Sequence, residues 1–272
     1  MTAQLLDAPV DLVDGYLAHL RAGGASPGTL KVRGSYLRRL DDSLPRGLLL
    51  ATRAELTAFL GTAGWSQETR HSCRSAMRGF FQWAEDEGLL GVKDPSYRLA
   101  RVAVPAGIPH PVPEPALARA LAAADAETRL MLLLGAYAGL RLAEIAQVHS
   151  DHIEATGLRV LGKGRKTRMV PLHPLLVEAL DGLDGWAFPS RGSSSAKEGA
   201  HVEVTYLHRR IRAALGGDWT AHSLRHRFAS RAYAGTKDLR AVQTLLGHSK
   251  PETTARYTLV PDESLSAAVA VL

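Results

Sequence analysis

Two segments decide the fold: AHSLRHRFAS at residues 221–230 and TLLGHSKPETTARYT at residues 244–258. In the first, His222 and Arg225 are three residues apart, so on a helix or in its first turn they project from the same side. One face of this predicted helix therefore carries two side chains that can donate hydrogen bonds and hold positive charge.

The second segment places a histidine and a tyrosine at helix ends. Gly247 predicts the end of a helix, and His248 follows it directly. Ser249 with Pro251 predicts the start of a short helix, and Tyr257 lies near its end. An arginine can hold two oxygens of a phosphate, and a tyrosine hydroxyl can act as a nucleophile once its neighbours activate it. The pattern favours chemistry on a phosphate group.

These segments resemble the tyrosine recombinases, the family of phage integrases and Xer-type recombinases. The family pattern is Arg, Lys, His-x-x-Arg, His and Tyr, and this chain has all six in order. They are Arg141 in AGLRLAEI, Lys163 in LGKGRKTRMVPL, His222 and Arg225 in HSLRH, His248 in LLGH and Tyr257 in TARYT.

The resemblance implies an enzyme that recombines specific DNA sites without metal, ATP or another cofactor. Tyr257 would attack the scissile phosphate and form a 3′-phosphotyrosyl link, while Arg141 and Arg225 would hold the non-bridging oxygens. Lys163 would protonate the departing 5′ oxygen, and the two histidines would assist. Tyr97, Tyr137, Tyr206 and Tyr233 lie in settings that look structural.

Several biological roles fit this chemistry. The first predicted helix begins near the start of the chain, so we expect no arm-site-binding domain. This leaves a small integrase of a phage or mobile element as the preferred interpretation, and a Xer-type resolvase of chromosome or plasmid dimers as the alternative. A type IB topoisomerase uses related chemistry, and a non-cleaving DNA-binding protein is the non-enzymatic alternative.

The composition is that of an ordinary globular protein, with 272 residues, 46% of them hydrophobic and 22% charged. A net charge of +6 favours polyanionic partners without proving one. Cys73 is the single cysteine, which excludes an intrachain disulfide and fits a reducing compartment. The apolar patch LMLLLGAYAGL is too short to span a bilayer, so we expect a cytoplasmic protein without a membrane partner.

The hydrophobic periodicity predicts a mainly α-helical chain with a small β-hairpin or sheet, in two domains. Residues 1–101 read as four helices and resemble the core-binding domain of the family. Residues 102–115 hold five prolines and predict a linker. Residues 116–272 would form the catalytic domain, ending in an apolar helix. That helix would pack on its own domain or on a neighbouring protomer.

Two groups of basic residues are candidates for DNA binding. Arg70, Arg74 and Arg78 follow one another at i, i+4 and i+8 on the fourth predicted helix. Such a row is usually a solvated face, but like charges also suit a phosphate backbone, which we prefer here. Lys166 and Arg168, beside the turn of the predicted hairpin, are expected backbone contacts as well.

The hairpin is predicted from two strand-like runs, 157–161 and 166–172, with GKGRK as the turn. The resemblance alone selects Lys163 in this turn as the catalytic lysine. Arg141 follows a very apolar helix, and its simplest explanation is a pair with Glu144 at i+3.

The sequence also bears on metal binding and on assembly. His222 and His226, four residues apart, lack the glutamate of the zinc-protease helix, so no metal is expected. The resemblance further implies double-stranded DNA recombination sites as partners. It implies a tetramer on two sites through exchange of the C-terminal helix, and it allows a directionality factor.

Overall fold

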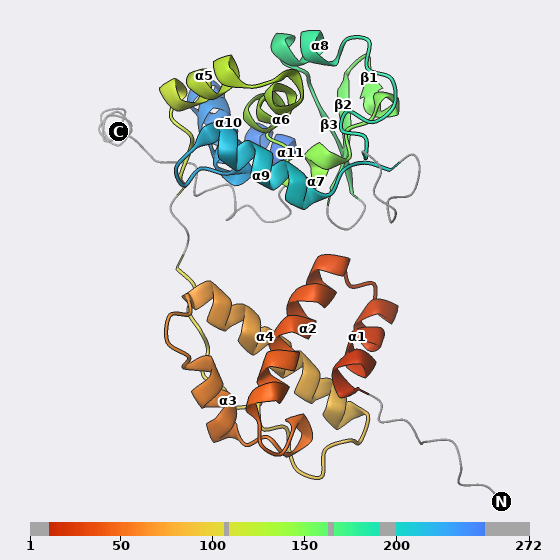
Figure 1. Cartoon of the computed structure of the whole chain (residues 1–272), viewed down its shortest axis with the longest axis vertical. Coiled ribbons are helices and arrows are strands. Elements are labelled where there is room, and N and C mark those ends of the chain that lie inside the picture. Colours follow the sequence, from red (N-terminus) through yellow and green to blue (C-terminus); the bar gives the residue numbers. More distant parts are fainter. Residues whose placement is uncertain (1–10, 106–108, 163–165, 191–199, 248–272) are drawn as a thin grey trace, which may run out of the picture. The chain divides into compact units, whose positions relative to one another are not determined.

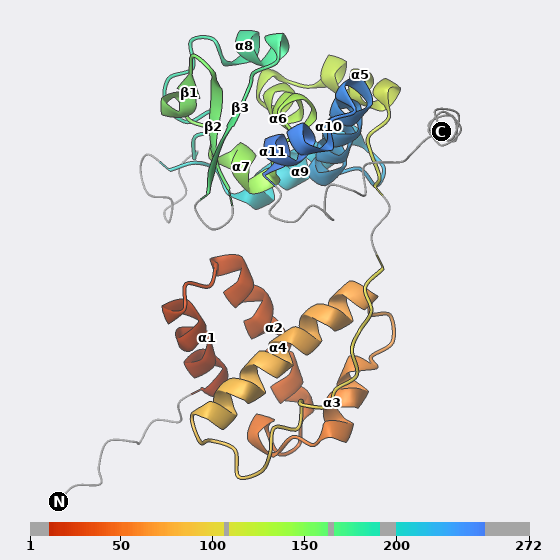
Figure 2. The same cartoon turned by 180° about the vertical axis from the view of Figure 1, so that it is seen from behind.

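The computed structural model describes residues 11–105, 109–162, 166–190 and 200–247. The chain divides into two compact units, Met1–Ala106 and Gly107–Leu272, with the boundary inside the proline-rich stretch (Figures 1 and 2). The described residues are mainly helical and include one three-stranded antiparallel sheet. This confirms the predicted fold class.

The first unit is built from four α-helices around an aromatic core. They are α1 (Leu12–Ala22), α2 (Pro27–Ser43), α3 (Arg53–Leu60) and α4 (Gln67–Asp86). Each begins where a side chain accepts hydrogen bonds from the first turn. These caps are Asp11, Ser26, Thr52 and Ser66. Thr52 and Glu55 form the capping box that their spacing predicts. Tyr16 and Phe80 meet edge-on in the core, with ring centroids 5.7 Å apart.

The second unit packs its helices around α6 (Ala126–Tyr137), most of whose residues are buried. The remaining helices in its described part are α5 (Glu114–Ala123), α7 (Leu142–Ala146), α8 (Pro174–Leu180), α9 (Val204–Leu215), α10 (Ala221–Thr236) and α11 (Leu239–Leu246). Helices α8, α9 and α10 all contact α6. The residues Leu132, Leu134, Ile211 and Leu224 are fully buried in this core.

The sheet has the strand order β1 (Ile153–Glu154), β2 (Gly157–Leu161), β3 (Thr167–Val170), all antiparallel. The first predicted strand is confirmed at the same bounds, and the second is shorter than the run 166–172. Among the α-helices and strands of the described residues, one helix and one strand were not predicted. The helix α7 has five residues and the strand β1 has two, which is too few for a periodic pattern to be recognised.

Candidate active site

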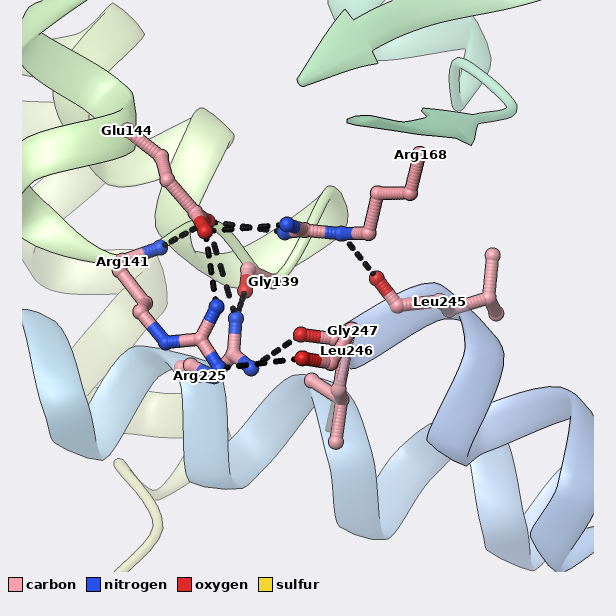
Figure 3. A network of polar contacts seen from close by, with 8 residues as sticks. All are labelled: Gly139, Arg141, Glu144, Arg168, Arg225, Leu245, Leu246 and Gly247. Carbon is pink, nitrogen blue, oxygen red and sulfur yellow. Dashed lines mark hydrogen bonds and ion pairs between the residues drawn. The ribbon is translucent and has the colours of Figure 1, made fainter. Parts of the chain in front are cut away.

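Glu144 is the centre of a polar network in the second unit (Figure 3). It lies in the first turn of α7, with 4% of its side chain exposed. Its Oε2 accepts the backbone N–H of Arg141 at 2.9 Å, and its Oε1 accepts Nη1 of the same arginine at 2.8 Å. The Arg141–Glu144 pair expected from the i+3 spacing is therefore present, and both of its residues are part of a larger network.

Arg168 reaches the same carboxylate from β3. Its Nη1 and Nη2 donate to the two oxygens of Glu144 at 2.9 and 2.8 Å, and its Nε donates to the carbonyl of Leu245 at 2.7 Å. A planar guanidinium and a carboxylate match each other in this two-pronged geometry. The Arg168 side chain is 9% exposed, so the contact is held away from solvent.

Arg225 completes the network from α10, with 1% of its side chain exposed. Its Nη1 donates to the carbonyl of Gly139 at 2.6 Å and its Nη2 to that of Leu246 at 2.5 Å. Its Nη1 also lies 3.8 Å from Oε2 of Glu144. A buried guanidinium is costly without partners. These contacts explain how Arg225 stays charged inside the protein.

The three arginines converge on the C-terminal end of α11 (Figure 3). Besides the two carbonyls already named, the carbonyl of Gly247 accepts from Nη2 of Arg141 at 3.5 Å. The last carbonyls of a helix lack intrahelical partners and carry partial negative charge, which cations stabilise. The network thus fixes the point at which the chain leaves α11, one residue before His248.

Two glycines of the network have little room for a side chain. Gly139 has φ 63°, and a Cβ there would lie 2.4 Å from Cδ1 of Phe228. Gly247 also has φ 63°, and its Cβ would lie 3.0 Å from Cδ of Arg168. Both positions therefore favour glycine for conformation and for space.

The site combines one ionised carboxylate with three guanidinium groups. Burial is the largest influence on the pKa of Glu144 and raises it. Hydrogen bonds from Arg168 and Arg141, with the charge of Arg168, outweigh burial and hold this pKa below its usual value. The network keeps a net positive charge. Among its arginines, Arg141 has the most exposed side chain, at 37%, so it is the one most accessible to an anion from solvent.

The helix α10 is also tied to the first residue of α5 and to the segment before it. Nε and Nη2 of Arg227 donate to the carboxylate of Glu114 at 2.9 and 2.7 Å, and these bonds, the largest influence, lower the pKa of Glu114. Nδ1 of His226 accepts the backbone N–H of His110 at 2.9 Å. The ring of His222, exposed in the first turn of α10, lies 4.2 Å from that of His226 between centroids. The helix that carries His222 is thus anchored at two points.

The structure brings together some of the predicted site residues. Arg141 and Arg225 meet at Glu144, and His222 lies one turn before Arg225 on α10. The other three predicted catalytic residues, Lys163, His248 and Tyr257, lie outside the described residues.

Arg168 is placed differently from Lys166, although both were expected to contact the DNA backbone. Lys166 is exposed, whereas Arg168 has all three guanidinium nitrogens engaged within the chain. This placement speaks against a DNA contact by Arg168. The alternation of side chains along β3 indicates that Arg168 faces the core. Arg168 stands opposite Val160 and two residues before Val170, and both valines are buried.

The arginine row of the first unit lies along α4, and each member bonds to a nearby backbone carbonyl. Arg70 donates to Leu60 and Thr62 at 3.1 and 3.3 Å. Arg74 donates twice to Leu99, at 2.9 and 3.3 Å, and Arg78 donates to Tyr97 at 3.2 Å. All three arginines remain partly exposed. Burial and the charges of Arg78 and Arg101 lower the pKa of Arg74.

Two kinds of feature are absent from the described residues. No group of three or more His, Cys, Asp or Glu side chains in these ranges is placed to hold a metal ion. Likewise, none of the helices in the part of the chain that the structure describes is long and apolar enough to cross a membrane.

Known proteins similar to this chain identify its family. Residues 114–263 match the phage integrase family. Tyrosine recombinase XerC of Mycobacterium tuberculosis is 32% identical, over 94% of this chain and 95% of the relative. Tyrosine recombinase XerA of Thermococcus kodakarensis is 29% identical, over 96% and 94%. A lambda integrase dimer bound to a COC′ core site shares the fold, with a TM-score of 0.69 at 20% identity, covering 90% of this chain and 75% of that one. The chain therefore belongs to the phage integrase family and is a tyrosine recombinase.

Proposed function

We propose that this chain is a site-specific DNA recombinase that acts as a small integrase of a phage or mobile element, cutting and rejoining DNA through a 3′-phosphotyrosyl intermediate. The observation that carries the proposal is the convergence of Arg141 and Arg225 on Glu144. Donors held in place before the reaction stabilise charge that develops on a phosphate in the transition state. The buried carboxylate supplies that rigidity.

The reaction would proceed by two phosphoryl transfers. The hydroxyl oxygen of Tyr257 attacks phosphorus and its proton passes to one of the assisting histidines, while the bond from phosphorus to the 5′ oxygen breaks and Lys163 gives that oxygen a proton. The 5′ hydroxyl of a partner duplex then attacks the phosphotyrosine and returns a proton to Lys163, and the released tyrosine regains its proton from the histidine. Each step makes one phosphate ester bond and breaks one, so the exchange needs no ATP.

The remaining predicted residues would serve this exchange. Arg141 and Arg225 would hold the non-bridging oxygens, and His222 and His248 would assist by hydrogen bonding or proton transfer. The exposure of His222 in the first turn of α10, three residues before Arg225, supports its assignment.

DNA binding would involve both units. We assign residues 1–101 to a core-binding domain, 102–115 to a linker and 116–272 to the catalytic domain. The net charge of +6 and the partly exposed arginine row on α4 support a contact with the phosphate backbone. Exposed Lys166 would add a contact beside the β2–β3 turn.

Assembly follows from the same proposal. Four copies would gather on two DNA sites through exchange of their C-terminal segments. A lambda integrase tetramer bound to a Holliday junction, which has a TM-score of 0.67 and 21% identity to this chain, supports the proposed number of copies. We place the reaction in the cytoplasm, with a directionality factor as a further partner.

The experiment is covalent trapping. Wild type, Tyr257→Phe and the control Tyr233→Phe are incubated with a nicked suicide duplex whose site has been selected from a randomised pool by covalent capture. A protease-sensitive protein–DNA adduct is expected in wild type and in the control. No captured duplex from the pool, or an adduct that survives in Tyr257→Phe, would contradict the proposed function or its nucleophile.

A Xer-type resolvase is the second candidate, favoured by the XerC and XerA relatives that match over almost their whole length. The two roles differ in the sites that they join. Recombination between two different sites on separate molecules supports the integrase. Efficient resolution of a plasmid dimer between two identical sites, with little intermolecular joining, supports the resolvase.

A further inference from the structure

We propose that Arg168 is a positioning residue for DNA cleavage: it locks β3 to Glu144 and to the end of α11, and through Glu144 it holds Arg141 in place. The inference rests on the proposed function and deepens it. It replaces the expectation that Arg168 touches DNA with a role inside the protein.

The bonding of Arg168 uses each of its three nitrogens. The two Nη atoms satisfy both oxygens of Glu144, and Nε satisfies the carbonyl of Leu245, which lies 77 residues away in the sequence. A lysine has one nitrogen at a single point and cannot reproduce this fork. Arg168 therefore joins three segments that are separate in the sequence: β3, the start of α7 and the end of α11.

The carboxylate transmits the position of Arg168 to Arg141. The oxygens that accept from Arg168 also accept the backbone N–H and Nη1 of Arg141, at 2.9 and 2.8 Å. Without Arg168, the carboxylate would be drawn toward Arg225, whose Nη1 is 3.8 Å away. A shift of the carboxylate would move the Arg141 guanidinium with it.

Packing around Arg168 indicates that its position is fixed. A Cβ at Gly247 would lie 3.0, 3.2 and 3.4 Å from three of its side-chain atoms, so the end of α11 rests directly on it. A Cβ at Gly162, just after β2, would lie 3.6 Å from its Nη1. The neighbouring backbone thus leaves the guanidinium little room to take another orientation.

A kinetic comparison separates positioning from DNA contact. Arg168→Lys keeps the charge but loses the fork, and Arg168→Gln loses the charge as well. Arg159→Lys is the matched control, since Arg159 lies on the adjacent strand β2, is 43% exposed and pairs with Glu154. For each protein, adduct formation on the suicide duplex is measured in a single turnover at saturating protein. Duplex affinity is measured across a series of salt concentrations. Melting curves set an assay temperature at which every variant is folded.

If Arg168 is a positioning residue, its substitution should slow adduct formation and leave the affinity for the duplex unchanged. Arg168→Lys should slow adduct formation by about 100-fold, the cost of displacing a catalytic group by about 1 Å. Its affinity for the duplex and the salt dependence of that affinity should match those of wild type, and Arg159→Lys should react normally. Arg168→Gln should be slowed at least as much, and it provides a second test if the lysine variant is unstable.

Two results would overturn the inference. If Arg168→Lys and Arg168→Gln react at the wild-type rate, the fork does not position the site. If instead affinity falls and the slope of its salt dependence drops by about 1 in Arg168→Gln, with an unchanged rate, Arg168 is a phosphate contact. A wild type that forms no adduct would overturn the proposed function together with this inference, so the two failures are distinguishable.

Discussion

The two units of this recombinase use arginine in opposite ways. On α4 of the first unit, Arg74 and its neighbours in the row donate to neutral carbonyls and stay partly exposed. In the second unit, Arg168 and Arg225 are almost fully buried and share the carboxylate of Glu144. A partly exposed arginine bonded to carbonyls keeps its whole charge for a polyanion. Arginines buried around a carboxylate have much of their charge balanced by it and are held in a fixed geometry.

Arg225→Ala should have the largest effect on stability, because it removes one of the two buried arginines that share the carboxylate of Glu144. Its removal leaves the carbonyls of Gly139 and Leu246 without their donor, and we expect a loss of about 3 to 5 kcal/mol in stability of the second unit. Hydrogen exchange of the α6 and α10 amides measures this loss. Arg231→Ala, on the same helix but 69% exposed, is the control and should cost less than about 1 kcal/mol. Equal protection in Arg225→Ala and wild type would contradict the account.

Glu144→Gln tests the charge at the centre of the network. Because the pKa of Glu144 is lowered in the folded protein, its ionised form stabilises the fold above the ordinary glutamate pKa, near 4.5. That contribution is lost as the pH falls through the lower folded pKa. At pH 7 we expect the variant to be less stable by about 3 kcal/mol.

The pH dependence of this difference is the sharper measurement. The stability gap between wild type and Glu144→Gln, followed by hydrogen exchange, should narrow as the pH is lowered below about 4.5, because the wild-type carboxyl then becomes neutral as well. A gap that stays constant from neutral to acidic pH would mean that Glu144 is not ionised in the fold.

Substitution of two glycines with similar backbone angles should cost less stability, and only one of the two substitutions should slow adduct formation. Gly247 has φ 63° and would bring a Cβ against Arg168, whereas Gly88 in the first unit has φ 69° and open space around it. Either change to alanine should cost about 1 kcal/mol for the left-handed backbone. Gly247→Ala should in addition slow adduct formation by about tenfold or more, since it displaces a positioning group. Equal adduct rates in the two variants would show that contact with Arg168 is unimportant.

Arg74→Ala should have a small effect on stability. It removes two hydrogen bonds to the carbonyl of Leu99, and we expect this loss to lower the stability of the first unit by about 1 kcal/mol. Cys73, the single cysteine, reports on this unit: its side chain is buried, and burial raises the pKa of its thiol to about 12. Thiol labelling of the native protein should become faster by about fivefold in Arg74→Ala and remain unchanged in the exposed control Arg119→Ala. Unchanged labelling in Arg74→Ala would show that the bonds to Leu99 do not support the core.

Local patterns in the sequence predicted the helices well. Caps such as Thr52 with Glu55, and the apolar spacing of α4, act within a few residues, so they can be read from the chain. The spacing of His222 and Arg225 marked them as candidates, and the family resemblance gave them and Arg141 their expected roles without knowledge of their three-dimensional neighbours.

The contacts that make these residues a site were not predicted, because they join distant segments. Arg168 meets Leu245 across 77 residues, and Arg141 meets Gly247 across 106. Glu144 was recognised as a partner of Arg141, but neither periodicity nor spacing indicates that two further arginines share its carboxylate. The alternation of β3 pointed Arg168 inward, yet its charge suggested a surface position.

The most direct test of the account is the rate of covalent adduct formation by Arg141→Ala on a saturating suicide duplex, with affinity measured in parallel. Arg141 is the most exposed arginine of the Glu144 network, and we assign it to the scissile phosphate. We expect a rate lower by about 100- to 1,000-fold, with affinity within about threefold of wild type. An adduct that forms at the wild-type rate would contradict it, because the network around Glu144 would then not be the site of the reaction.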